Sequence, residues 1–294
     1  MNGYLNVLKP PGVSSAGIVN EIKALTGERV GHAGTLDPEA AGILPVMVGR
    51  ATRLLSYFGG GDKEYVAEVA FTGSTDTQDA QGTLCEAGRG MPEPAAVQAA
   101  IPAFVGDILQ SPPAYSALKR DGVPLYKLAR RGDQVETKAR PVRIDRIDLL
   151  SFREDSCLIR VQCGGGTYIR TLCHDLGVRL SCPAHMRFLL RTRVGAFSLD
   201  GALTMEEVRG AHAEGTLSER LLPCDFPLQH HPRLTVPSSF QKQAENGVAI
   251  PAAFYEGLRE GECYRVYDQK GFLGMAQLRE NALRFSVISR GNGD

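Results

Sequence analysis

The segment RVGHAGTLDPEAAGILPVMVGR, residues 29–50, contains an aspartate that could do chemistry. Pro38 follows Asp37 directly and biases it toward an extended backbone, while the surrounding glycines permit tight turns and close approach of a ligand. An aspartate held in this way can point into a cleft and act as a nucleophile or stabilise developing charge. On spacing alone, an Asp-Pro turn at the surface is the favoured explanation.

A second group of polar residues lies in CGGGTYIRTLCHD, residues 163–175. The glycines resemble a phosphate loop, but no Gly-Lys-Ser/Thr follows them and no G-x-G-x-x-G follows a predicted strand, which disfavours an ATPase or a dinucleotide enzyme. Tyr168 and Arg170 lie near the start of a predicted helix. Arg170 either pairs with a carboxylate, keeping it ionised and its pKa low, or is an exposed residue of an amphipathic helix.

Other catalytic patterns are missing from the sequence. It has no H-E-x-x-H and no G-x-S-x-G motif, and its seven cysteines form no C-x-x-C pair, so we expect reduced core thiols, no metal and no serine nucleophile. Tyr65, which opens a predicted strand, is either a core aromatic or a residue that stacks on a base.

The charge distribution favours a polyanionic partner even though the formal net charge is zero. Residues 119–146 contain nine Lys/Arg and four Asp/Glu, and residues 168–193 contain five Arg and one Asp. Local potential, not the total charge, governs affinity for RNA. Two basic stretches with tyrosines among them therefore indicate an RNA-binding protein, although each stretch alone reads as a solvated face.

The predicted elements describe an α+β protein, because strands and helices alternate irregularly. Residues 28–45 are predicted to be a loop region punctuated by Gly and Pro, and 73–94 to be loop or turns. No run of 18 apolar residues and no signal-like N-terminus is present, so we expect a cytoplasmic protein without a membrane span. Helices are predicted from Ser14 or Ser15 to Gly27 and at 51–58, 94–104, 124–131, 168–180 and 204–213. Strands are predicted at 4–8, 65–71, 142–151 and 157–163, with a strand or strand pair at 186–197. Short strands are predicted near 234–236, 262–267, 271–278 and 283–288.

Taken together, these segments resemble the TruB-type tRNA pseudouridine synthases. The similar segments include LNVLKPPGVSS (5–15), RVGHAGTLDPEAAGILPVMVGRATR (29–53), KEYVAEVAFTGSTDTQDAQG (63–82), GGGTYIRTLCHDLG (164–177) and CPAHMRFLLRTRVGAF (182–197). They occur in the family's order and cover most of residues 5–197.

The resemblance implies a pseudouridine synthase catalytic domain at 1–228, with a central, mostly antiparallel mixed sheet flanked by helices and loops. An insertion near 112–140 would close over the RNA. A small β-rich, PUA-like RNA-binding domain would follow at 229–294.

The resemblance also assigns roles to individual residues. Asp37 corresponds to the catalytic aspartate, Tyr65 to the tyrosine that stacks on the target base and is a candidate for proton removal, and Arg170 to the arginine that pairs with the aspartate. Five further residues are implied in binding the substrate or supporting its site: His32, which fills the gap left by the flipped base, Lys9 and Pro10, which support the active-site loops, Tyr168, and Leu189, which lines the uracil pocket.

The implied reaction is isomerisation of the uridine at position 55, in the T-loop of tRNA, to pseudouridine. It needs no cofactor, and we expect a monomer that binds the T-arm. The alternative is a non-catalytic tRNA-binding or tRNA-folding protein on the same scaffold. A carboxylate paired with arginine disfavours that alternative, because a pure binding protein does not need one.

Overall fold

The computed structural model describes all residues except 60, 117–118, 121, 126–130, 132–136 and 290–294. The described helices are α1 (Ser15–Thr26), α2 (Pro94–Ala100), α4 (Ile169–Arg179), α5 (Met205–Ala213) and α6 (Gln241–Glu245), with 3-10 helices η1 (Gly49–Tyr57), η2 (Ile101–Phe104), η3 (Leu217–Arg220), η4 (Phe226–Leu228), η5 (Ser238–Phe240) and η6 (Ala252–Phe254). None of them is both long and apolar enough to span a bilayer.

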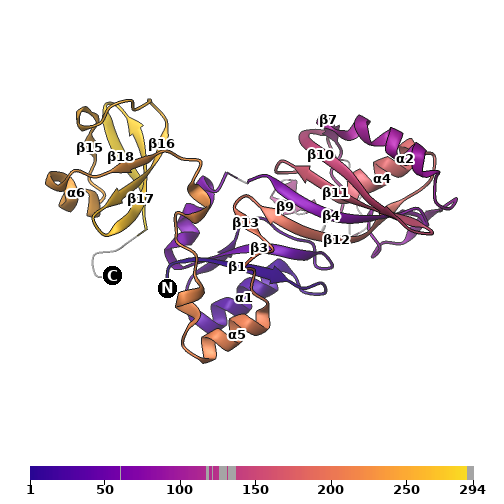
Figure 1. The fold of residues 1–294 in the computed structure, drawn as a ribbon, viewed down its shortest axis with the longest axis horizontal. Helices are drawn as coiled ribbons and strands as arrows, with labels where there is room; N and C mark the ends of the chain where they lie inside the picture. The colour runs from indigo at the N-terminus through magenta and orange to yellow at the C-terminus, as the bar shows by residue number, and fades with distance from the viewer. Residues whose placement is uncertain (60, 117–118, 121, 126–130, 132–136, 290–294) are drawn as a thin grey trace.

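A large mixed sheet forms the centre of the catalytic region (Figure 1). Its strand order is β1-β3-β12-β4-β11-β10-β7, with β2 paired to β3 and β13 paired to β12. All pairs are antiparallel except β3 with β12, which are parallel over only two residue pairs. The strands are β1 (Gly3–Lys9), β2 (Val30–His32), β3 (Ala41–Val48), β4 (Lys63–Ala70), β7 (Gly106–Gln110), β10 (Arg140–Phe152), β11 (Ser156–Cys163), β12 (His185–Val194) and β13 (Phe197–Ser198).

Each half of this sheet has its own apolar core. On one half, α1 and α5 pack against β1 and β3, and Ile18 and Ile22 of α1 are buried there. On the other half, α4 covers β4 and β11 through Leu172 and Leu176. The short parallel pairing of β3 with β12 is therefore a seam between these two cores, and a further apolar cluster, which includes Ile43 of β3 and Val194 of β12, packs across it.

Helix α1 shows how the sequence sets its own limits. The Ser14 side chain accepts a hydrogen bond from the Gly17 backbone N–H at the start, and Gly27 adopts a left-handed conformation (φ 67°) at the end. These are the preferred N-terminal and C-terminal caps of a helix. The predicted boundaries of this helix are confirmed.

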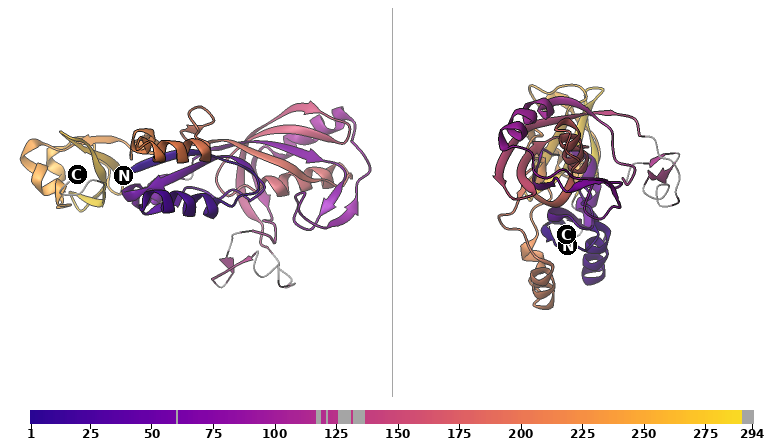
Figure 2. Two further views of the ribbon diagram at one scale, coloured as in Figure 1. Left: turned by 90° about the horizontal axis from the view of Figure 1, so that it is seen from below. Right: turned by 90° about the vertical axis from the view of Figure 1, so that its right-hand side faces the viewer.

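The remaining strands form separate small sheets. β5 (Gly73–Thr75) pairs with β6 (Leu84–Ala87), and β8 (Lys119–Arg120) pairs with β9 (Val123–Pro124) in a hairpin that stands away from the body (Figure 2). The C-terminal β-rich domain has a five-stranded sheet with its own core around Val266 and Leu278. Its strands are β14 (Arg233–Thr235), β15 (Ile250–Pro251), β16 (Cys263–Asp268), β17 (Gly271–Arg279) and β18 (Ala282–Ile288).

Several sequence predictions were wrong. Residues 28–45 are not simply a loop, because they contain β2 and the first part of β3. β3 is buried on both faces, so its apolar run lacks the alternation that marks a half-exposed strand. The 73–94 segment, predicted as loop or turns, contains the β5–β6 hairpin. Strand β7 was not predicted, and the predicted helix at 124–131 lies largely outside the described residues.

Gly42 is required where β3 meets β12. It pairs with Arg191 at φ 119°, and an added Cβ would lie 2.2 Å from the Arg191 carbonyl oxygen. We expect Gly42→Ala to lower the free energy of unfolding by about 3 kcal/mol, because it adds a clash to backbone strain. Urea unfolding would measure this loss.

Gly201 provides the matched control. It also has a positive φ, 70°, but a Cβ there would meet nothing within 4 Å. Gly201→Ala should cost only the backbone penalty, about 1 kcal/mol. Equal losses for the two variants would show that the close approach of the two strands does not demand glycine.

Candidate active site

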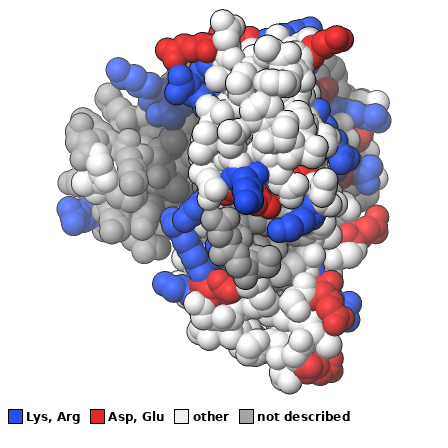
Figure 3. Space-filling view, turned by 90° about the vertical axis from the view of Figure 1, so that its left-hand side faces the viewer, with Lys and Arg blue, Asp and Glu red and all other residues white. Residues whose placement is uncertain are grey.

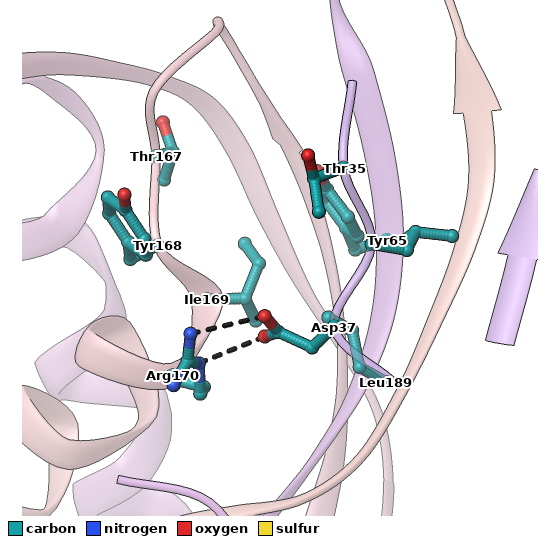
Figure 4. A pocket seen from close by; sticks show the side chains of 9 residues that line it. Thr35, Asp37, Tyr65, Thr167, Tyr168, Ile169, Arg170 and Leu189 are labelled. Carbon is teal, nitrogen blue, oxygen red and sulfur yellow. Dashed lines mark hydrogen bonds and ion pairs between the residues drawn. The ribbon is translucent and has the colours of Figure 1, made fainter. Parts of the chain in front are cut away.

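A pocket of about 100 Å³ opens at the seam, and five of the residues assigned from the sequence line it. Asp37, Tyr65, Tyr168, Arg170 and Leu189 come from four separate segments of the chain and face the same space (Figure 4). Thr35, Leu36, Thr167 and Ile169 complete the lining.

Asp37 and Arg170 form a two-pronged ion pair across this pocket. Arg170 Nε lies 3.0 Å from Asp37 Oδ2, and Arg170 Nη2 donates to Oδ1 at 3.2 Å. The Arg170 side chain is buried, whereas 40% of the Asp37 side chain is exposed toward the pocket. The fork geometry fixes the orientation of the carboxylate as well as neutralising it.

Arg170 is itself held by a second set of acceptors. Its Nη1 lies 3.5 Å from Oδ2 of Asp79 and donates to the Thr77 carbonyl at 3.4 Å, while Nη2 donates to the Tyr115 carbonyl at 3.1 Å. Two carboxylates therefore share one buried guanidinium. Asp79 lies in the TDTQDAQG segment, where the sequence offered no sign that it would join the site.

Electrostatics at Asp37 differ from the sequence prediction. Arg170 was expected to depress the pKa of the carboxyl, but burial raises the pKa above its ordinary value, and the attraction of Arg170 offsets this only in part. The nearby charge of Asp79 raises the pKa further. Although part of the carboxylate faces the open pocket, the surrounding protein removes much of its water, and desolvation is the larger effect.

This shift has a consequence for the pH dependence of activity. If catalysis needs ionised Asp37, the active form is complete only above the raised pKa and is lost as the pH falls through it. We expect kcat to fall on the acid side with an apparent pKa above the usual range for aspartate. The pH profile is measured with RNA substrate between about pH 4 and pH 8. A rate that stays flat down to the ordinary aspartate pKa would show that Arg170 outweighs burial.

The loop that carries Asp37 is fixed by buried side chains beneath it. Lys9 Nζ donates to the carbonyls of Pro10, Val13 and Pro38 at 2.7–2.8 Å. Ser15 Oγ both accepts from the Leu36 backbone N–H and donates to its carbonyl, each at 2.9 Å. Burial lowers the pKa of Lys9 to about 8. Lys9 thus supports the loop, as the resemblance implied, and does not line the pocket.

Pro10 and His32 also lie outside the pocket lining. Pro10 is exposed and contributes its carbonyl to Lys9. His32 ends β2, and its buried Nδ1 makes no hydrogen bond with any described residue. Burial lowers the pKa of His32, so its ring is neutral at pH 7 and can offer a nitrogen to an incoming base.

The aromatic and apolar walls of the pocket are equally well fixed. Tyr65 and Leu189 are buried on the neighbouring strands β4 and β12. Tyr168 precedes α4, and the Gln110 side chain holds its backbone, accepting from its N–H at 2.7 Å and donating to its carbonyl at 3.0 Å. Gln110 belongs to β7, the strand that the sequence did not predict, so its part in the site was also missed.

This geometry can perform chemistry on a base without a cofactor group. A carboxylate and an aromatic ring line one pocket, and an arginine orients the carboxylate and favours its charged form. No cluster of His, Cys, Asp or Glu suited to a metal ion occurs within the described part of the chain.

The fold occurs in a solved structure, and two family profiles match the sequence. The crystal structure of a Cbf5-Nop10-Gar1 complex contains a chain that superposes with a TM-score of 0.75, at 25% sequence identity, over 98% of this chain and 85% of that one. The profile of the TruB family pseudouridylate synthase N-terminal domain matches residues 23–169, and the profile of the tRNA pseudouridylate synthase B C-terminal domain matches residues 170–229.

Curated relatives agree over almost the whole length. A tRNA pseudouridine synthase B of Alkaliphilus oremlandii is 40% identical over 95% of this chain and 94% of its own. Another, of Moorella thermoacetica, is 44% identical over 92% of each chain. The chain therefore belongs to the TruB family and is a pseudouridine synthase, as the sequence motifs had implied.

Proposed function

We propose that this enzyme isomerises the uridine at position 55, in the T-loop of tRNA, to pseudouridine, with Asp37 as the catalytic carboxylate. The observation that carries the proposal is the pocket in which Asp37, oriented by Arg170, faces Tyr65. Relatives that are 40% and 44% identical over more than nine-tenths of both chains are named tRNA pseudouridine synthase B.

The reaction explains why such a pocket is needed. A C–N glycosidic bond breaks, the free uracil rotates, and a C–C bond forms between the same base and the same sugar. The base must not escape, so it needs a closed pocket with an apolar wall, which Leu189 and Ile169 provide. No electron and no group is transferred to another molecule, and hence the reaction requires no cofactor.

Each polar residue then has a distinct role. Asp37 attacks either C1′ of the ribose or C6 of the base, or stabilises the charge that develops on the sugar. Arg170 keeps the carboxylate ionised and aimed at these atoms. Tyr65 stacks on the uracil and accepts the proton that leaves the sugar or C5.

The target uridine has to leave the folded T-loop to reach this pocket. Flipping a base out of its stack costs a few kcal/mol, roughly, and a side chain that fills the vacated space offsets part of it. His32 lies next to the loop that carries Asp37. It is suited to this role because its ring is neutral and its Nδ1 forms no hydrogen bond with the described residues.

Basic side chains near the site would hold the phosphates. Arg140, Arg143 and Arg146 are exposed along β10, although Arg143 and Arg146 also pair with Asp145 and Asp148. At the end of the molecule formed by the C-terminal domain, described basic and acidic side chains are interspersed (Figure 3). Affinity for RNA should therefore come mainly from the catalytic region and decrease with salt.

The proposal extends to the domains, the oligomeric state and the location of the enzyme. The catalytic domain would comprise residues 1–228, with the 112–140 segment closing over the RNA, and the β-rich domain at 229–294 would act as a PUA-like RNA-binding module. A monomer working in the cytoplasm suits an enzyme that binds one tRNA arm.

The test uses a tRNA transcript that carries tritium at C5 of its uridines. The expected result is release of one equivalent of tritium per tRNA, and no release when uridine 55 is replaced by cytidine. Release that persists from the cytidine transcript would place the target elsewhere. No release from the unmodified transcript would overturn the tRNA proposal as a whole.

A further inference from the structure

Arg191 lies at the centre of the seam, and no role in the reaction has yet been given to it. It is buried, with 1% of its surface exposed. On β12 it stands directly opposite Tyr65 of β4 and opposite Gly42 of β3. A buried arginine in this position contacts both of the bodies that form the pocket.

Three backbone carbonyls accept hydrogen bonds from the Arg191 side chain. Its Nε donates to Ile43 at 2.8 Å, its Nη2 to Gly34 at 3.0 Å and its Nη1 to Thr35 at 3.4 Å. These carbonyls lie on both sides of Asp37 along the chain. Arg191 therefore holds the loop from above β12, while Lys9 and Ser15 hold it from the other side.

The charge of Arg191 is not neutralised by these contacts. Carbonyl groups carry no net charge, and no carboxylate of a described residue forms an ion pair with the Arg191 guanidinium. Burial lowers its pKa, yet an arginine stays protonated in proteins. A buried cation without an ion-pair partner is costly, so its presence beside the site calls for a function.

Arg191 also lies beside Tyr65. The two residues are paired on adjacent antiparallel strands, so their side chains lie on the same face of the sheet. The positive charge of Arg191 therefore acts on the phenol of Tyr65.

We infer that Arg191 is a positioning residue that holds the Asp37 loop in one fixed geometry and places its positive charge beside the Tyr65 phenol, which it stabilises in the ionised form. This inference rests on the proposed role of Tyr65 as proton acceptor. A neutral phenol cannot take a proton from carbon, so Tyr65 must first lose its own proton to water. The phenolate then accepts the proton from the nucleoside and becomes a phenol again, without any change in oxidation state.

The groups around Tyr65 act against this ionisation, except for Arg191. Burial, Cys163 of β11 and Asp37 all raise the pKa of the Tyr65 phenol, whereas Arg191 lowers it. Arg191 thus offsets part of the penalty that the pocket imposes on a phenolate.

The first test needs neither RNA nor activity. The nine tyrosines are replaced by 3-fluorotyrosine, a stronger acid, and the signal of Tyr65 is assigned in the 19F NMR spectrum by its loss in Tyr65→Phe. In Arg191→Gln, the pKa of this residue should rise by about one unit or more, a tenfold change in its acid constant. An unchanged titration in folded Arg191→Gln would overturn the inference.

Arg193→Gln is the matched control. It removes the same charge from the same strand, where Arg193 stands opposite Glu64 and not Tyr65. The Tyr65 signal should titrate as in the wild type. An equal shift in both variants would mean that total charge, and not the Arg191 contact, controls Tyr65, and would also overturn the inference.

Arg191→Lys keeps a buried cation and is decisive if Arg191→Gln does not fold. A lysine has its three N–H donors on one nitrogen and cannot reproduce the spacing at which Nε, Nη1 and Nη2 of Arg191 each bond a different carbonyl. We expect kcat on tRNA to fall at least about tenfold with KM changed less than about twofold, since the loss affects orientation and not binding. Wild-type kcat together with an unmoved Tyr65 signal would refute the role.

Failure of the proposed function and failure of the Arg191 inference would give different results. If the wild-type protein released no tritium from tRNA but the Tyr65 titration still moved in Arg191→Gln, the tRNA proposal would fail and the Arg191 contact would stand. The opposite pattern would leave the Asp37 chemistry intact and remove Arg191 from it.

Discussion

Asp37→Asn is expected to reduce tritium release from tRNA by at least about a thousand-fold, because an amide can neither attack carbon nor balance the charge on the sugar. The substitution keeps the shape of the side chain and can still accept from Arg170. Binding of tRNA should therefore remain within about threefold of the wild type, measured by filter binding at fixed salt.

Glu39→Gln is a matched control for this variant. It removes an exposed carboxylate two residues away in the same loop and should leave tritium release unchanged. If Asp37→Asn lost binding together with activity, Asp37 would be a structural residue of the loop. If it kept activity, the carboxylate would have no part in the reaction.

Arg170→Ala should lower turnover by about a hundred-fold or more while affinity for tRNA changes little. The variant leaves Asp37 and Asp79 without the guanidinium that they share, so the two carboxylates repel each other without a cation to offset the repulsion. The pKa of Asp37 should rise further, so the acid limb of kcat should move to higher pH and activity should partly recover as the pH is raised.

Arg170→Lys separates charge from geometry. It keeps a cation but not the fork that bonds both carboxylate oxygens. We expect the acid limb to return toward that of the wild type while turnover stays low. An unchanged turnover rate in Arg170→Ala would exclude Arg170 from the mechanism.

The sequence predicted the members of the pocket better than the means of holding them. Asp37, Tyr65, Arg170, Tyr168 and Leu189 were assigned by resemblance to a family, and the structure brings all five to one pocket. Spacing alone favoured a surface turn for Asp37, because the partners of this residue come from segments far away in the chain. Only long-range packing puts a tyrosine and an arginine beside it.

The parts that could not be predicted depend on contacts at the backbone. Arg191 and Gln110 form hydrogen bonds mainly with main-chain groups. Because every residue type has a main-chain carbonyl, no sequence motif reveals such a contact. Strand β3 was missed because a strand buried on both faces shows no alternation. The direction of the pKa shift at Asp37 was wrong because a sequence shows the charged partner but not the loss of water.

The seam between β3 and β12 gives the ion pair of the active site a second meaning. The loop that carries Asp37 leads into β3 and one body of the sheet, while Arg170 belongs to α4 and the other body. The backbone joins β3 to β12 over only two residue pairs. The Asp37–Arg170 pair thus also ties the loop before β3 to α4, together with Leu36 and Ala40, which pack in the core that α4 covers.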